Sequence, residues 1–153
     1  MNIALGADDA AVELKNVIKA YLEAQGIAVT DYGVHSAEPS LYPDIAAEVA
    51  VAVAAHKHER GILLCGTGLG MAITANKIPG IRAATCHDTY SAERARKSND
   101  AQILTMGARV IGPELAKTVV EAWLRSEFQG GGSTRKVERI NEIEREYNKP
   151  QEC

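Results

Sequence analysis

The segment "GILLCGTGLGMAITANK", residues 61–77, joins an apolar run to a glycine-rich turn and then to a helical pattern. Ile62, Leu63 and Leu64 predict a buried strand, and the helix is expected from Met71. Glycines occupy alternate positions between the two, where they let backbone N–H groups turn toward one point without a Cβ in the way. A strand, a glycine turn and a helix in this order are typical of an α/β protein with an anion-binding loop.

The remainder of the chain repeats this alternation of short apolar runs and longer amphipathic segments. Strands are expected at residues 2–5, 27–32, 61–64, 82–85 and 103–106. Helices are expected at residues 10–25, 43–55, 71–76, 88–97, 113–126 and about 133–147. Such an order predicts right-handed βαβ units. We therefore expect a Rossmann-like three-layer sandwich, in which a five-stranded parallel sheet carries helices on both faces and a C-terminal helix follows.

The length of the chain suits a single domain over residues 1–153. The sequence "QGGGS" at 129–133 predicts a flexible joint before a C-terminal helix at 134–148. We expect this helix to lie at a subunit interface, because its apolar stripe is narrow. The stripe consists of Val137, Ile140, Ile143 and Tyr147.

The composition excludes several classes of protein. The net charge is −3 and basic residues are interleaved with acidic ones, so no nucleic-acid surface is predicted. The longest apolar-rich stretch, 45–55, is too short to span a membrane, and the first residues lack the basic region of a signal peptide. Three cysteines without a CxxC pair predict neither a disulfide framework nor a metal site, and they fit a reducing cytoplasm.

Cys65 stands where the glycine loop begins. The loop lacks both the GK[ST] of a Walker loop and the spacing of the dinucleotide fingerprint, so we expect no nucleotide cofactor. A thiol among backbone amides can form a thiolate that abstracts a proton, and the same amides can stabilise the resulting oxyanion. Thr67 can hydrogen-bond to the thiol or to a substrate. The alternative is that Cys65 is a small buried apolar side chain.

Ligands of parallel sheets bind beyond the carboxyl ends of the strands, so the loops there are candidates for the site. Asp8 and Asp9 follow the first strand and can bind sugar hydroxyls, although either can instead cap the next helix. Arg109 follows the fifth strand and is a candidate for binding phosphate. His87 lies on the loop after the fourth strand, and its role stays open. The histidines of "HKHER" at 56–60 are expected at the surface.

A family resemblance runs nearly from end to end of the chain. The segments that carry it are "GADDAA" (6–11), "YPDIA" (42–46), "GILLCGTGLGMAITANK" (61–77), "PGIRAA" (79–84), "SNDAQILTMGARVIG" (98–112) and the last helix. In these the chain resembles the ribose-5-phosphate isomerase B and galactose-6-phosphate isomerase family. The resemblance implies a Rossmann-like fold, dimers or tetramers, no metal or cofactor, and aldose–ketose isomerisation of phosphorylated sugars through an enediolate.

The resemblance also implies roles for individual residues. Cys65 would be the catalytic base, with Thr67 and Ser98 at the other catalytic positions, and the glycine loop would form the oxyanion hole. Basic residues would hold the phosphate, those of the last helix often coming from the neighbouring subunit; here they are Arg109, Arg135 and Lys136. The substrate-binding positions would be Asp8, Asp9, Tyr42, Gly66, Gly68, Leu69, Gly70, His87 and Asn99.

The chain departs from the family pattern at three places. Asp9 stands where the family usually has a histidine, and Ser98 stands where it has the histidine that is thought to open the sugar ring. The tail, usually GGRH and then Arg, reads Gly-Gly-Ser at 131–133 with Lys136 at the later position, so Arg135 is the nearby residue that would compensate.

The missing ring-opening histidine favours a substrate that has no stable ring. Ribose 5-phosphate closes to a furanose through its free O4, whereas a tetrose 4-phosphate has O4 blocked and stays open. The segment 87–112 also resembles the branch of the family that acts on tetrulose 4-phosphates in erythritol breakdown. We therefore predict interconversion of D-erythrulose 4-phosphate and D-erythrose 4-phosphate. Ribose 5-phosphate is the main alternative, a six-carbon 6-phosphate is another, and a phosphosugar-binding module without turnover is the non-enzymatic alternative.

Overall fold

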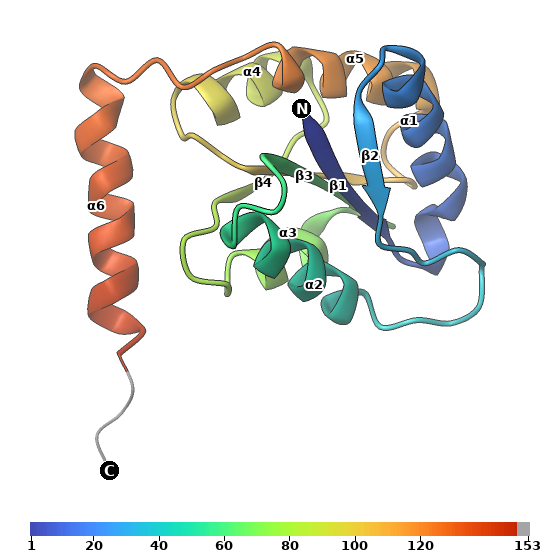
Figure 1. The fold of residues 1–153 in the computed structure, drawn as a ribbon, viewed down its shortest axis with the longest axis horizontal. Coiled ribbons are helices and arrows are strands. Elements are labelled where there is room, and N and C mark those ends of the chain that lie inside the picture. Colours follow the sequence, from blue (N-terminus) through green and yellow to red (C-terminus); the bar gives the residue numbers. More distant parts are fainter. Residues whose placement is uncertain (150–153) are drawn as a thin grey trace.

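A computed structural model describes residues 1–149, and Cys153 lies outside them. Its centre is a sheet of five parallel strands in the order β2-β1-β3-β5-β4 (Figure 1). The strands are β1 (Asn2–Ala7), β2 (Ala28–Asp31), β3 (Arg60–Cys65), β4 (Ala83–Thr85) and β5 (Ile103–Gly107). The predicted Rossmann-like sandwich is therefore confirmed, and each predicted strand is present to within a few residues.

Helices cover both faces of the sheet. The helical elements are η1 (Asp9–Ala11), α1 (Val12–Ala24), α2 (Tyr42–Ala54), α3 (Leu69–Ala75), α4 (Thr89–Lys97), α5 (Pro113–Leu124) and α6 (Gly132–Tyr147). One apolar core joins α1, α4 and α5 to the sheet, and the other joins α2 and α3 to it. Successive residues of β3 point to opposite cores, with Leu64 in the first and Leu63 and Cys65 in the second. This alternation places the thiol on the face covered by α2 and α3.

The edge of the sheet where the strands end, called here the carboxyl edge, contains the crevice of the fold. The chain passes from β1 outward to β2 and returns to β3 on the other side of β1. The loops that follow β1 and β3 therefore diverge, and ligands of open parallel sheets bind at such a switch point. The opposite edge, where the strands begin, is called here the amino edge.

Several local predictions are confirmed and others need correction. Asp88 caps α4 by accepting a hydrogen bond from the Ser91 N–H at 2.7 Å. The flexible joint is shorter than predicted, because α6 already begins at Gly132. The prediction for His58 was wrong: its ring is buried, and its Nε2 lies 2.7 Å from the Tyr32 hydroxyl. The charged neighbours of His58 in "HKHER" favoured a surface position for its ring. However, β3 begins only two residues later, and the His58 side chain points into the protein.

Helix α6 stands apart from the sandwich at the end of an extended segment (Figure 1). Its contacts lie at the amino edge, where Glu144 accepts a hydrogen bond from Gly80 N at 3.0 Å and Asn141 accepts one from Arg82 Nη1 at 3.0 Å. Val137 is buried, whereas the rest of the predicted apolar stripe is exposed: Ile140, Ile143 and Tyr147.

Candidate active site

Cys65 ends β3 with its side chain buried and its Sγ facing the glycine loop. The Gly68 N–H donates a hydrogen bond to this sulfur at 3.1 Å. Gly68 has a φ of +79°, and a Cβ there would lie 2.8 Å from the Met106 carbonyl carbon. Only glycine combines this left-handed conformation with such a close approach to β5. The predicted meeting of a thiol with loop amides is thus present, and an N–H that donates to sulfur stabilises a thiolate.

The other loop residues form the exposed rim of the site. Thr67 Oγ1 accepts a hydrogen bond from Leu69 N at 3.3 Å, so in this structure its hydroxyl contacts the loop. A Cβ on Gly70 would overlap with the Tyr42 ring, so the ring lies directly against this glycine. The start of α2 thereby brings Tyr42 to the loop.

Arg109 joins the site from the end of β5. Backbone hydrogen bonds tie the two loops together, from Ala108 N to Cys65 O at 2.8 Å and from Arg109 N to Gly66 O at 3.0 Å. The guanidinium lies against Gly66, where a Cβ would be 3.3 Å from Nη1. An exposed guanidinium beside loop amides is suited to a phosphate.

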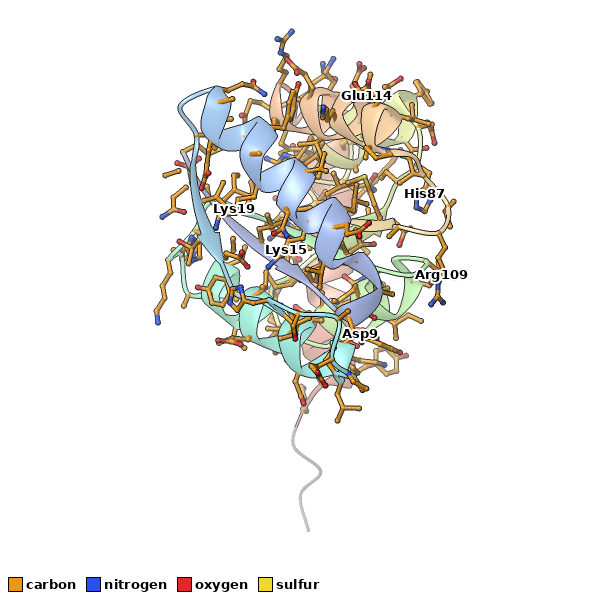
Figure 2. All side chains as sticks on the ribbon, turned by 90° about the vertical axis from the view of Figure 1, so that its right-hand side faces the viewer. Asp9, Lys15, Lys19, His87, Arg109 and Glu114 are labelled. Atoms are coloured by element: carbon orange, nitrogen blue, oxygen red, sulfur yellow. The ribbon has the colours of Figure 1, made fainter. Side chains whose placement is uncertain are left out.

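Asp8 and Asp9 reach the same edge from β1, and their environments differ. Asp8 caps the 3₁₀ turn by accepting from Ala10 N at 3.0 Å, and burial raises its pKa. Asp9 accepts from the Ser40 hydroxyl at 2.9 Å, which lowers its pKa. The positive charge of Arg109 favours the ionised form of both carboxyls. In Figure 2 the Arg109 side chain lies between those of Asp9 and His87 at the carboxyl edge.

His87 is partly exposed and contacts the end of β5. Its Nε2 accepts a hydrogen bond from Gly107 N at 2.9 Å. Because a backbone N–H can only donate, Nε2 is unprotonated and the neutral ring carries its proton on Nδ1. The neighbouring thiol, Cys86, is buried, and burial raises its pKa to about 11. The Cys86 thiol is therefore largely protonated near neutral pH and is a poor candidate for the base.

Two residues of this site were missed by the sequence analysis. Thr105 donates from its Oγ1 to Gly68 O at 2.8 Å, beneath the loop. Ser40 holds Asp9 and thereby fastens the loop after β2 to the end of β1. A hydroxyl inside the apolar run "ILTMG" was a signal for Thr105, whereas nothing in its sequence context distinguishes Ser40 from an ordinary loop serine.

Four of the predicted site residues lie away from Cys65. Ser98 ends α4 and accepts hydrogen bonds from Arg94, and Asn99 accepts one from Arg82 Nε at 3.0 Å. Arg82 precedes β4, so this group lies at the amino edge. The same guanidinium contacts α6, which carries Arg135 and Lys136. Ser98 and Asn99 therefore lie at the opposite edge from the thiol, and α6, which carries Arg135 and Lys136, contacts that same edge through Asn141 and Glu144.

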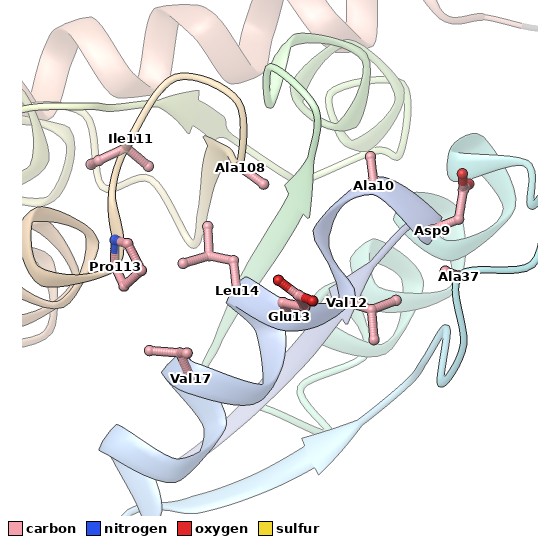
Figure 3. Close-up of a pocket in the computed structure, with 10 residues that line it drawn as sticks. All are labelled: Asp9, Ala10, Val12, Glu13, Leu14, Val17, Ala37, Ala108, Ile111 and Pro113. Atoms are coloured by element: carbon pink, nitrogen blue, oxygen red, sulfur yellow. The ribbon is translucent and has the colours of Figure 1, made fainter.

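A groove of about 610 Å³ opens beside the site on the other face of the sheet (Figure 3). Its walls are mostly apolar and come from α1 and from the segment that joins β5 to α5; they are Asp9, Ala10, Val12, Glu13, Leu14, Val17, Ala37, Ala108, Ile111 and Pro113. Neither Cys65 nor the glycine loop contributes to it, so we do not assign it to the reaction.

Residues 1–149 contain no group of three or more His, Cys, Asp or Glu side chains arranged to hold a metal ion. Within the same range, none of the helices has the length and apolar character needed to cross a bilayer.

The arrangement at the carboxyl edge is suited to moving a proton on an anionic substrate. The Cys65 thiol accepts a hydrogen bond from one backbone N–H of the glycine loop, and the Arg109 guanidinium lies against the same loop near two carboxyls. A base next to fixed donors can remove a proton from carbon and stabilise the oxyanion that forms. The guanidinium can hold a phosphate while this happens.

Comparison with known proteins identifies the family. The profile described as Ribose/Galactose Isomerase matches residues 3–143. The chain is 60% identical over 145 residues to the D-erythrulose-4-phosphate isomerase of Pectobacterium atrosepticum, with 94% of this chain and 95% of that protein covered. It is 56% identical to a ribose-5-P isomerase B of Listeria innocua, with coverage of 94% and 97%.

A solved structure agrees with both sequence matches. The ribose-5-phosphate isomerase B of Clostridium thermocellum superposes with a TM-score of 0.95 and 47% identity, covering 97% of this chain and 100% of that one. The resemblance noted in the sequence is thus confirmed over nearly the whole length. This chain belongs to the ribose/galactose isomerase family.

Proposed function

We propose that this sugar-phosphate isomerase interconverts D-erythrose 4-phosphate and D-erythrulose 4-phosphate, with Cys65 as the base. The observation that carries the proposal is the hydrogen bond from Gly68 N to Cys65 Sγ inside the glycine loop. The thiolate removes the proton from C2 of the aldose and returns it to C1, while the hydroxyl proton passes from O2 to O1. One base on one face of the enediolate performs both transfers.

The loop amides stabilise the enediolate, and the charged residues bind the rest of the substrate. The N–H groups of the loop donate to the enediolate oxygens, which carry more negative charge than the carbonyl of the substrate. Arg109 binds the phosphate from the end of β5. Asp8 and Tyr42 hydrogen-bond to the sugar hydroxyls, with the Asp8 carboxylate as acceptor. Asp9 is held by Ser40 and shapes the wall of the site.

The proposal includes a dimer in which each site draws on both chains. Ser98 and Asn99 lie at the amino edge, and α6 with Arg135 and Lys136 contacts that edge, so within one chain these residues do not meet a substrate bound at Cys65. Arg82 holds both segments through Asn99 O and Asn141, which would let a partner subunit deliver them as one unit. The exposed stripe of α6 supplies apolar surface for such a contact. The thiol must stay reduced to act as a base, which supports a cytoplasmic location.

The four-carbon substrate is supported by Ser98 and by the P. atrosepticum relative. Serine is far too weak an acid to replace the imidazole that protonates a ring oxygen. A tetrose 4-phosphate needs no such step. The second candidate is ribose 5-phosphate, which the name of the L. innocua relative favours. A binding module without turnover is not favoured, because the thiol and the whole glycine loop are present.

The experiment compares kcat/KM for D-erythrulose 4-phosphate and ribose 5-phosphate in the same assay, with a six-carbon 6-phosphate as a third substrate. We expect the tetrulose phosphate to give the highest value. A higher value for ribose 5-phosphate would assign this chain to the five-carbon reaction instead. Absence of turnover with all three substrates would contradict the proposed function itself.

A further inference from the structure

Thr105 lies directly beneath the glycine loop, and the reaction proposed above gives it no part. Its side chain is fully buried in β5, where Leu104 and Met106 flank it. Burying a hydroxyl costs free energy unless it is hydrogen-bonded, and a valine would fill the same space. The hydroxyl of Thr105 donates to Gly68 O at 2.8 Å. Its partner is therefore the residue whose N–H faces the thiol of Cys65.

Thr85 extends this contact into a chain of two hydroxyls. The two threonines are register partners in neighbouring strands, and their Oγ1 atoms are 2.7 Å apart. Each hydroxyl has one proton to donate. Thr85 Oγ1 also lies 3.4 Å from Gly68 O, but the shorter contact with that oxygen, 2.8 Å, belongs to Thr105. We therefore assign the proton of Thr105 to Gly68 O and the proton of Thr85 to Thr105 Oγ1. Successive hydrogen bonds of this kind strengthen one another, so Gly68 O is held more firmly than by Thr105 alone.

The position of Gly68 O determines where the next N–H points. In a trans peptide the C=O and N–H point in opposite directions. Since Gly68 O is directed at buried hydroxyls, the Leu69 N–H points to the exposed side, where it meets Thr67 Oγ1 at 3.3 Å. The Ala72 N–H bonds the same oxygen at 3.1 Å and fixes the start of α3.

We propose that Thr105, supported by Thr85, is a positioning residue of the isomerase. The two hydroxyls orient the Gly68–Leu69 peptide so that Leu69 N–H exchanges its 3.3 Å contact with Thr67 Oγ1 for the enediolate oxygen beside Cys65. Neither threonine touches the substrate. The inference rests on the proposed function, because it assigns a role to one donor of the same oxyanion hole.

Thr105→Val tests this positioning role, because valine keeps the shape and removes the hydroxyl. Removing a donor of an oxyanion hole lowers kcat about 10²–10³-fold, and a donor that is only misplaced should cost about 10–100-fold. We expect kcat to fall by about that factor while KM changes less than about threefold. Thr105→Ser should recover most of the loss. A hydroxamate mimic of the enediolate should bind more weakly to Thr105→Val by about the factor lost in kcat, because it needs the same donor.

Thr118→Val is the matched control, since its hydroxyl also donates to a backbone carbonyl, Glu114 O at 3.0 Å, but on the exposed face of α5. If Thr105→Val lowers only the melting temperature and leaves kcat within twofold, or if Thr105→Ser fails to rescue it, the inference is wrong. Should Thr105→Val not fold, Thr85→Val decides: a loss of at least about threefold in kcat supports the inference, and an unchanged kcat overturns it. An inactive wild type would instead contradict the proposed function.

Discussion

Two variants that are each inactive should regain activity when their subunits are mixed, because the proposed site combines the carboxyl edge of one chain with the amino edge of another. The first variant, Cys65→Ala, lacks the base. The second replaces Arg135 and Lys136 by Ala and so lacks the cations of α6. In a mixed dimer, one site receives Cys65 from the second variant and the cations of α6 from the first. That site is intact, and the other lacks both contributions.

The size of the recovery follows from the geometry. Strands β1 and β3 have six residues each, so the two edges are roughly 16–20 Å apart at about 3.3 Å per residue. A four-carbon sugar phosphate cannot bridge that distance within one chain. Random reassortment of equal amounts makes half of the dimers mixed, and each mixed dimer has one working site of two. Activity should therefore return to about a quarter of the wild-type value.

The assay is the rate of isomerisation at low substrate concentration, after the variants are mixed under mild denaturant and the denaturant is diluted. Each variant treated alone is the control for incomplete inactivation. A mixture that stays at the mean of the two separate activities would refute the shared site, because it would mean that each chain supplies all of its own catalytic groups. Light scattering at the same concentration must show a dimer or a larger assembly.

Further substitutions test individual residues. Cys65→Ala should lower kcat about 10²–10⁴-fold while substrate still binds, and near-normal turnover would exclude this thiol as the base. Gly68→Ala should lower the melting temperature by several degrees and abolish most activity. The left-handed φ costs an alanine about 1–2 kcal/mol, and its Cβ would contact the backbone of Met106, so an unchanged melting curve would contradict this prediction. Arg109→Ala should raise KM about 10–100-fold, from a charge-assisted contact worth about 1.5–3 kcal/mol, and an unchanged KM would remove it from phosphate binding. Ser98→His should raise kcat/KM for ribose 5-phosphate more than for the tetrulose phosphate, and equal effects on both would refute the ring-opening argument.

The sheet and the glycine loop were predictable from sequence because local patterns determine them. Apolar runs at regular intervals specify parallel strands, and a strand followed by alternate glycines specifies the turn that bears Cys65. The rule that ligands bind beyond the carboxyl ends then brings together Asp8, Cys65 and Arg109, which lie far apart in the chain. The structure confirms this neighbourhood through the backbone bonds between the loops after β3 and β5.

Other features of the site were not predictable because they depend on contacts between distant segments. The hydrogen bond between Ser40 and Asp9 joins residues that are 31 positions apart, and no pattern in either segment predicts it. The His58 ring is buried where it contacts Tyr32. The charged neighbours of His58 in the chain gave no indication of this contact. Ser98 is separated from Cys65 because α4 runs back along the sheet. Ser98 directly follows α4 and therefore lies at the amino edge.

His87 bears directly on whether this chain can open a sugar ring without the histidine that Ser98 replaces. The Gly107 N–H occupies its Nε2 at 2.9 Å, so the neutral ring has only the Nδ1 proton to give. Giving that proton would leave an imidazolate, which is inaccessible near neutral pH. If Nε2 were protonated first, its N–H would face the Gly107 N–H, and two donors cannot bond to each other. The hydrogen bond to Gly107, two residues before Arg109, would then be lost. Ring opening by His87 would therefore disturb the loop that carries Arg109 in every turnover, whereas an open-chain tetrulose phosphate makes no such demand on His87.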